Sequence, residues 1–303
     1  MRVMDALLYA FLCVIWGSTW LAIKVGLVGV PPFLGAGLRF VISATVLGVM
    51  LAVRRQAIRL TRVDKTCILS LGLLVFWLDY AAVYWAELRI SSGLTAILFS
   101  TMPLMTALLS HFWTHAETLS GRKTVGIAVG IVGTTLLFWP QERLGLQEVL
   151  GMLAALFGSL CASINLVTMK RYANRADPMV LNFFGMGLGA ACLLTMSAVL
   201  ERSGAVAWTQ SNVLALVYLA VFGSVIAFTT YFRLIKVMDA TVVSLNTLII
   251  PIVALALGYI FLKETLTPLS IVGIGVVLIG VAVAILPTRR RHAKTQAASP
   301  LEP

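Results

Sequence analysis

The sequence predicts an all-α integral membrane protein with ten transmembrane helices arranged as a 5+5 inverted repeat. Three observations predict this fold: a composition too apolar for a soluble domain, ten separate apolar runs, and a repeat that relates the two halves of the chain. Of the 303 residues, 60% are hydrophobic and 12% are charged, and the mean hydropathy is +0.97. Soluble domains average about 25% charged residues, so the composition excludes a soluble globule.

The apolar runs are long enough to be membrane-spanning helices, each of which takes about 20 predominantly apolar residues. In chain order they cover residues 7–28, 33–53, 67–88, 93–113, 124–139, 149–169, 180–200, 212–235, 240–262 and 269–286. The alternating ten-residue segments of a membrane β-barrel are absent from the sequence, so the spans are predicted to be helices. The first run carries Trp16 and Trp20 and lacks a small-residue cleavage site, which indicates a retained span and not a signal peptide.

The distribution of Lys and Arg between the runs predicts the orientation. With the N-terminus inside, seventeen basic residues face the cytoplasm and five face outward. Because short cytoplasmic loops are enriched in Lys and Arg, both termini are predicted to be cytoplasmic in the plasma or inner cell membrane. The formal net charge of +11 has the same explanation, so no nucleic-acid partner is predicted.

The internal repeat appears when residues 117–140 are aligned with residues 264–287, at a constant offset of 147, with nine identities in 24 positions. The same offset matches Pro31 with Pro178 and Tyr84 with Tyr231. Five spans per half is an odd number, so the second half enters the membrane from the opposite side, as in secondary transporters. We expect a first repeat over 1–140, a second over 141–287, and a disordered basic cytoplasmic tail over 288–303.

Several motifs resemble those of EamA-type carriers of the drug/metabolite transporter superfamily. They are Trp16-Gly17, Lys24, Leu38-Arg39-Phe40, Pro103, Pro251, Glu117 before a glycine-rich fifth span, and Glu264-Thr265-Leu266. The resemblance covers about 7–140 and 149–287. It implies a basket of five plus five helices and, commonly, export of amino acids or other small metabolites.

Two prolines stand near the middle of the fourth and ninth spans, in corresponding positions of the two halves. Pro103 and Pro251 each remove a helical hydrogen bond and free the carbonyl four residues earlier, on Phe99 and Thr247. Interrupted helices at matched depth are the best sequence indication of a transporter binding site. Two interpretations stay open: a site lined by these groups with Ser100, Thr101 and Asn246, or packing kinks whose freed carbonyls are satisfied by neighbouring hydroxyls.

Two charges lie deep in the predicted membrane. At 1.5 Å rise per residue, Arg39 is about 9 Å from the outer start of its span, and Asp79 is about 13 Å from the outer end of its own. An isolated charge there costs at least about 2.5 to 3.5 kcal/mol, so the two charges are expected to pair or to face a water-filled cavity. We predict that they lie within salt-bridge reach. The pair would either fix helix register or act as a proton-linked switch, and whether Asp79 titrates stays open.

The third span carries an aromatic stripe of Phe76, Trp77, Tyr80 and Tyr84. Such a stripe is either helix packing or the wall of a substrate cavity. Gly126-x-x-x-Gly130 and Gly185-x-x-x-Gly189 predict close helix approach.

No metal or cofactor is predicted. The four cysteines lie in or beside apolar runs without metal-ligand spacing, and the sequence contains no Walker motif.

The function predicted from these features is secondary transport of a small-molecule substrate across the lipid bilayer by alternating access. The leading form is an exporter of amino acids or other small amphipathic metabolites; a multidrug-type efflux carrier is the alternative, and an intramembrane enzyme or a scaffold is disfavoured. No catalytic residue is predicted. The predicted substrate-binding residues are Trp16, Trp20, Arg39, Asp79, Tyr80, Phe99, Ser100, Thr101, Asn246 and Thr247, with Pro103 and Pro251 as helix kinks. Direction, coupling ion and oligomeric state stay open.

Overall fold

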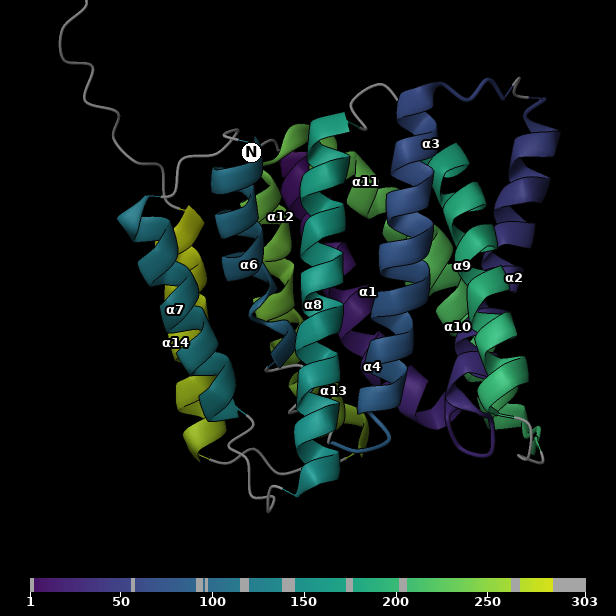
Figure 1. Ribbon diagram of the computed structural model, residues 1–303. Coiled ribbons are helices and arrows are strands. Elements are labelled where there is room, and N and C mark those ends of the chain that lie inside the picture. The colour runs from purple at the N-terminus through teal and green to yellow at the C-terminus, as the bar shows by residue number, and fades with distance from the viewer. Residues whose placement is uncertain are drawn as a thin grey trace, which may run out of the picture.

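The computed structural model describes residues 3–55, 58–90, 95, 98–114, 120–137, 145–172, 177–201, 206–262 and 268–285. All elements in this part of the chain are helical (Figure 1). In the first part of the chain they are α1 (Val3–Gly26), α2 (Pro32–Val53), α3 (Arg62–Leu69), η1 (Ser70–Asp79), α4 (Tyr80–Ala86), α6 (Met102–Leu109), η2 (Ser110–Thr114) and α7 (Gly121–Leu137). The remainder are α8 (Leu146–Tyr172), α9 (Pro178–Leu200), α10 (Gln210–Ala220), η3 (Val221–Ile226), α11 (Ala227–Val237), α12 (Ala240–Ser244), α13 (Asn246–Leu262) and α14 (Pro268–Ile285).

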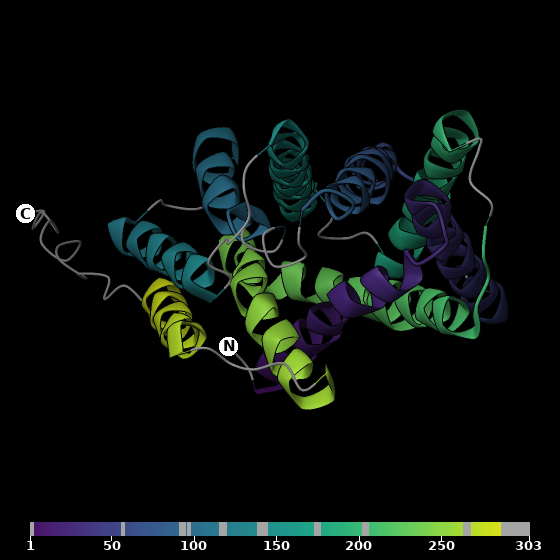
Figure 2. The ribbon, with the colours of Figure 1, turned by 90° about the horizontal axis from the view of Figure 1, so that it is seen from below.

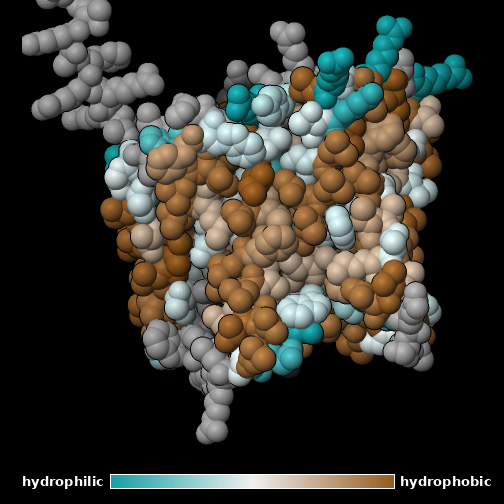
Figure 3. Space-filling view, in the orientation of Figure 1, coloured by the Kyte–Doolittle hydropathy of each residue, from teal (hydrophilic) through white to brown (hydrophobic). Residues whose placement is uncertain are grey.

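Six continuous helices in the described part of the chain are long and apolar enough to cross a membrane. They are Val3–Gly26, Pro32–Val53, Arg62–Ala86, Leu146–Tyr172, Pro178–Leu200 and Gln210–Val237, and shorter apolar helices cover Ala240–Val253 and Ile271–Ala284. Apolar residues form a broad band across the visible face, and hydrophilic residues gather at the end where α3 begins (Figure 3). A multi-pass membrane protein is therefore confirmed. The ten-span repeat stays a prediction, and the tail over 288–303 lies outside the described residues.

Side chains cap the helices where the sequence leaves an apolar run. Thr61 and Asp64 form a reciprocal capping box at the start of α3. The first amides of α2, from Phe33 and Leu34, donate to the carboxylate of Glu201 at the end of α9, at 2.8 and 3.0 Å. These bonds satisfy amides that have no partner within their own helix.

Two π-helical segments interrupt long α-helices. The π-helical segments η1 and η3 lie in the middle of the helices Arg62–Ala86 and Gln210–Val237. A π-turn displaces the usual backbone hydrogen bonds and often occurs beside a functional site. Asp79 ends η1 and Ser224 lies within η3.

Glycines bring two helix pairs together as predicted. A side chain at Gly126 or Gly133 of α7 would collide with the backbone of α14, at 2.6 Å from Ala284 N and 2.5 Å from Val277 N, respectively. These two helices stand side by side at one edge of the bundle (Figures 1 and 2). Gly185 similarly admits Leu71 of η1 against α9, at 3.0 Å.

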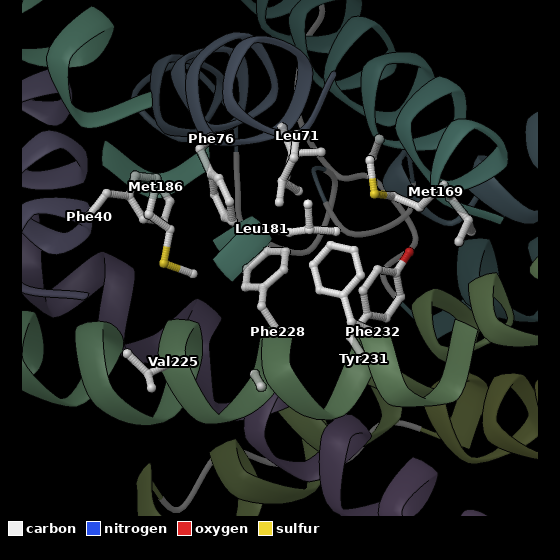
Figure 4. Packing of buried hydrophobic residues seen from close by; sticks show 14 of the residues in the cluster. Phe40, Leu71, Phe76, Met169, Leu181, Met186, Val225, Phe228, Tyr231 and Phe232 are labelled. Atoms are coloured by element: carbon white, nitrogen blue, oxygen red, sulfur yellow. The ribbon is translucent and has the colours of Figure 1, made fainter. Parts of the chain in front are cut away.

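The main core fills the space between η1, α9 and α11. Phe76 and Phe228 meet edge to face with ring centroids 4.8 Å apart. Figure 4 shows these rings pointing toward each other, with Leu181 and Met186 of α9 beside them. This packing fixes the helices that carry the residues described next.

Candidate functional site

A cavity lies between α1, η1 and α4, α6, α8, α11 and α13. Its empty volume is about 890 Å³ with the space at its mouth included. Six aromatic side chains line it: Trp16, Trp20, Tyr80, Phe99, Phe228 and Tyr231. The other lining residues are Thr19, Ile23, Val75, Asp79, Val83, Met102, Ala162, Asn165, Asn246, Thr247, Ile250 and Pro251.

The cavity collects most of the residues that the sequence singled out. Seven of the ten predicted substrate-binding residues line it, together with Pro251. Arg39, Ser100, Thr101 and Pro103 do not. The cavity also includes residues that sequence reasoning missed, notably Asn165 of α8 and the pair Phe228 and Tyr231 of α11.

Arg39 of α2 is enclosed by hydrogen-bond acceptors and is 1% exposed. Its Nε donates to Ser224 Oγ at 2.8 Å, and its Nη2 donates to the Gly223 carbonyl oxygen at 3.2 Å. Its Nη1 and Nη2 donate to the hydroxyls of Tyr84 and Tyr80 at 3.4 and 3.3 Å. Arg39 therefore ties α2 to the π-segment η3 and to α4, and it faces away from the cavity.

Asp79 is buried, at 5% exposed, and lines the cavity. Its Oδ1 has no hydrogen-bond partner, and a Cβ added to Gly158 of α8 would lie 2.8 Å from it. Arg39 and Asp79 form no ion pair among the described side chains, so the predicted salt bridge is wrong. The physical reason is that the guanidinium of Arg39 already donates hydrogen bonds to a hydroxyl and a carbonyl of η3 and to two tyrosine hydroxyls of α4.

At the helix break before α6, neighbouring hydroxyls satisfy the backbone carbonyls. The freed carbonyl of Phe99 accepts a hydrogen bond from Ser159 Oγ at 3.4 Å, and the carbonyl of Met102 accepts one from Ser163 Oγ at 3.3 Å. Thr101 Oγ1 donates to the Leu98 carbonyl at 2.7 Å. Here the interpretation of Pro103 as a packing kink with satisfied carbonyls agrees with the structure.

The break in the ninth span differs, because the chain turns at Leu245, six residues before Pro251. The hydroxyl of Thr247 donates back to the Ser244 carbonyl at 2.8 Å. Asn246 begins α13 and lines the cavity at 1% exposed, and its Nδ2 has no partner. This break therefore leaves one amide donor unused at the cavity.

The Trp16-Gly17 pair positions α1 in the site. Trp16 Nε1 donates to the Gly223 carbonyl at 3.3 Å, and its ring lies 5.1 Å from that of Tyr231. A Cβ at Gly17 would lie 2.6 Å from Val253, so only glycine lets α1 approach α13 this closely. Glu117 and Glu264 of the resemblance lie outside the described residues.

One end of the cavity is closed. Lys170 Nζ at the end of α8 donates to the Ile235 carbonyl at 2.9 Å, and the Tyr9 hydroxyl donates to the Val242 carbonyl at 3.2 Å. Cys13 is buried about one turn along α1 from Tyr9, in the same core cluster. The lining residues of α1 are in its C-terminal half, so the cavity extends away from this closed end.

The profile of the EamA-like transporter family matches residues 4–139 and 149–286. A crystal structure of a protein with 22% sequence identity superposes with a TM-score of 0.78, covering 97% of this chain and all of the other. That likeness shows a shared fold.

Three curated relatives cover most of the chain. The uncharacterized transporter YoaV of Bacillus subtilis is 28% identical over 88% of this chain and 91% of its own. The uncharacterized inner membrane transporter YedA of Escherichia coli is 30% identical, with coverage of 91% and 88%. The probable amino-acid metabolite efflux pump of Escherichia coli is 27% identical, with coverage of 95% and 97%.

Proposed function

The chain belongs to the EamA-like transporter family, and from this premise we propose that it is a secondary carrier that exports amino acids or other small amphipathic metabolites. Family membership makes it a multi-pass membrane transporter and not an enzyme. Export, substrate class and an alternating-access mechanism are the parts that we propose.

The observation that carries the proposal is the cavity between the two predicted repeats. Its walls come from α1, η1, α4 and α6 in the first repeat and from α8, α11 and α13 in the second. In carriers with inverted repeats, substrates bind near the midplane at the junction of the repeats. The large α2–α9 and α7–α14 interfaces each join equivalent spans of the two repeats, which supports the same arrangement.

The chemistry of the walls supports an amphipathic solute. Aromatic faces offer apolar contact to one part of the molecule, while Asp79 and Asn246 offer an unused acceptor and an unused donor to its polar part. The name of the Escherichia coli relative, a probable amino-acid metabolite efflux pump, supports solutes of this kind and the direction of transport.

Alternating access is supported by the closed end of the cavity. With both termini in the cytoplasm, as the charge distribution predicts, the contacts of Lys170 and Tyr9 would close the cytoplasmic side. Rocking the two repeats would break these contacts and close the outer side instead. The observed arrangement would then be the outward-facing state.

Thiol protection tests the binding site. In a chain without its four native cysteines, a cysteine replaces Ala162 in the cavity wall or, as control, exposed Gln147 at the start of α8. Radiolabelled metabolites that undergo counterflow in proteoliposomes should slow labelling at position 162 and leave position 147 unchanged. Equal labelling of position 162 with and without a saturating counterflow substrate would place the site elsewhere.

The closed end can be tested with the native Cys13 as the only cysteine. Lys170→Met removes the bond to Ile235, so Cys13 should react faster with a thiol reagent added on the cytoplasmic side. Lys236→Met, on the exposed side of α11, is the matched control. Unchanged reactivity of Cys13 in the Lys170 variant would contradict the proposed gate.

A further inference from the structure

The charges on the cavity wall are unbalanced. Among the lining residues that the structure describes, Asp79 is the one with a carboxylate, and none is Lys, Arg or His. The buried guanidinium of Arg39 donates its hydrogen bonds to Ser224, Gly223 and two tyrosine hydroxyls. The cavity therefore presents one acidic group that no basic side chain in the described part of its wall compensates.

The carboxylate is held in place by its surroundings. Asp79 ends the π-segment η1, and a Cβ added to Gly158 of α8 would lie 2.8 Å from its Oδ1, so any other residue at position 158 would displace the carboxylate. Burying a carboxylate without a hydrogen bond costs several kcal/mol. An isolated buried acceptor fixed at a cavity wall is thus set for a donor that arrives with the ligand.

Aromatic faces surround the same space. A cation within about 6 Å of an aromatic ring is attracted by the ring quadrupole, more strongly when water is excluded. The ring centroids of Trp16 and Tyr231 are 5.1 Å apart, and those of Trp20 and Phe99 are 6.5 Å apart. These rings line the cavity together with the ring of Tyr80 on α4. An ammonium group would gain from Asp79 and from these rings together.

A ligand carboxylate finds much weaker partners. The unused Nδ2 of Asn246 is a neutral donor, and an ion pair or charge-assisted bond is about twice as strong as a neutral one. A carboxylate in the cavity would also be repelled by Asp79 in a medium of low dielectric constant.

We propose that the cavity selects molecules with one protonated amino group, no free carboxylate and an apolar or aromatic body, and that Asp79 accepts hydrogen bonds from the ammonium group. This inference rests on the proposed function of a carrier for small amphipathic metabolites, and it narrows the substrates to amines and amino-acid esters or amides, because a free amino acid carries a carboxylate. Asn246 would bind a neutral acceptor of the ligand, such as an ester or amide carbonyl.

Four probes with one aromatic skeleton test the selection by charge: phenethylamine, phenylalanine methyl ester, phenylalanine and 3-phenylpropionate. Each competes for labelling of the cysteine at position 162 in the full-length chain. The amine and the ester should protect at concentrations at least tenfold lower than phenylalanine, and 3-phenylpropionate should protect least. Asp79→Asn should remove this order by weakening the two cations at least tenfold, whereas Asp5→Asn, near the N-terminal end of α1, should keep it.

Four outcomes would overturn the proposal. The acid or the zwitterion could protect as well as the amine, or Asp79→Asn could leave the order unchanged, and in either case the cavity binds ligands without selecting a cation. If no probe protects position 162 while counterflow substrates do, this inference fails and the proposed function stands. If counterflow substrates also give no protection, both fail. The order in the chain with Asp79 intact is decisive even if the Asp79 variant does not fold.

Discussion

Arg39 and Asp79 are both buried in the membrane-spanning part of the protein, and the structure treats them in opposite ways. Arg39 donates to four groups from α4 and η3, whereas Oδ1 of Asp79 has no partner. Depth and cost of burial are similar, so neither explains the difference. The difference indicates that a buried charge with a full set of hydrogen-bond partners stabilises the fold, whereas a buried charge without a partner is available to bind a ligand.

The largest expected effect is the loss of Arg39. Arg39→Met removes the donor to Ser224 Oγ and to the hydroxyls of Tyr80 and Tyr84, and removing one partner of a buried charged network costs about 3 to 5 kcal/mol. We expect that decrease in the free energy of unfolding, measured in mixed micelles with a denaturing detergent. Arg59→Met, at an exposed position before α3, should change it little. An equal decrease in the free energy of unfolding in the two variants would show that Arg39 does not stabilise the fold.

A smaller effect is expected from crowding Asp79. In Gly158→Ala, the new Cβ would lie 2.8 Å from Asp79 Oδ1 and 3.4 Å from Val83 Cγ2. Overpacking of this kind costs about 1 to 3 kcal/mol, and the displaced carboxylate should weaken ligand protection of position 162. Gly187→Ala on α9 meets no atom within 4 Å and should keep both quantities. Full stability and protection in Gly158→Ala would show that Asp79 is not fixed.

Removing Asp79 should act on stability with the opposite sign to removing Arg39. Asp79→Leu replaces an unpaired buried carboxylate by an apolar side chain, which is neutral or stabilising by about 1 kcal/mol or more. Counterflow transport should fall while the melting temperature in detergent stays or rises. A melting temperature that falls as far as in Arg39→Met would make Asp79 a structural residue and end the contrast.

The sequence locates the helices because hydropathy is a property of single segments. The predicted span 33–53 corresponds to Pro32–Val53, and 180–200 corresponds to Pro178–Leu200. The glycine pairs were informative for the same reason, since a glycine permits close approach whichever helix arrives. The position of the break at Leu245 could not be predicted from Pro251, because hydroxyl bonds within the turn place it.

The site was predicted in part. Trp16, Asp79 and Asn246 were found because polar or aromatic groups are conspicuous in apolar spans. Asn165 carries the same signal and was missed, and Tyr231 was noted only as the repeat partner of Tyr84. The partners of Arg39 could not be predicted, because they depend on a carbonyl exposed by the π-turn of η3 and on which face each helix presents.

The smallest expected effect is the direct coupling between Arg39 and Asp79. If the two side chains paired, removing both would cost much less than the sum of the single changes. Since Arg39 donates elsewhere, the cycle of Arg39→Met and Asp79→Leu should give a coupling below about 1 kcal/mol, transmitted through Tyr80, which bonds one residue and follows the other. The cycle of Arg39→Met with Ser224→Ala is the positive control, because that 2.8 Å hydrogen bond involves a charge and should couple by about 1.5 to 3 kcal/mol. A coupling of Arg39 with Asp79 as large as this control would mean that the two charges pair in the membrane. Asp79 would then be occupied by the protein, and the cavity would lose the open carboxylate on which its selection of cations depends.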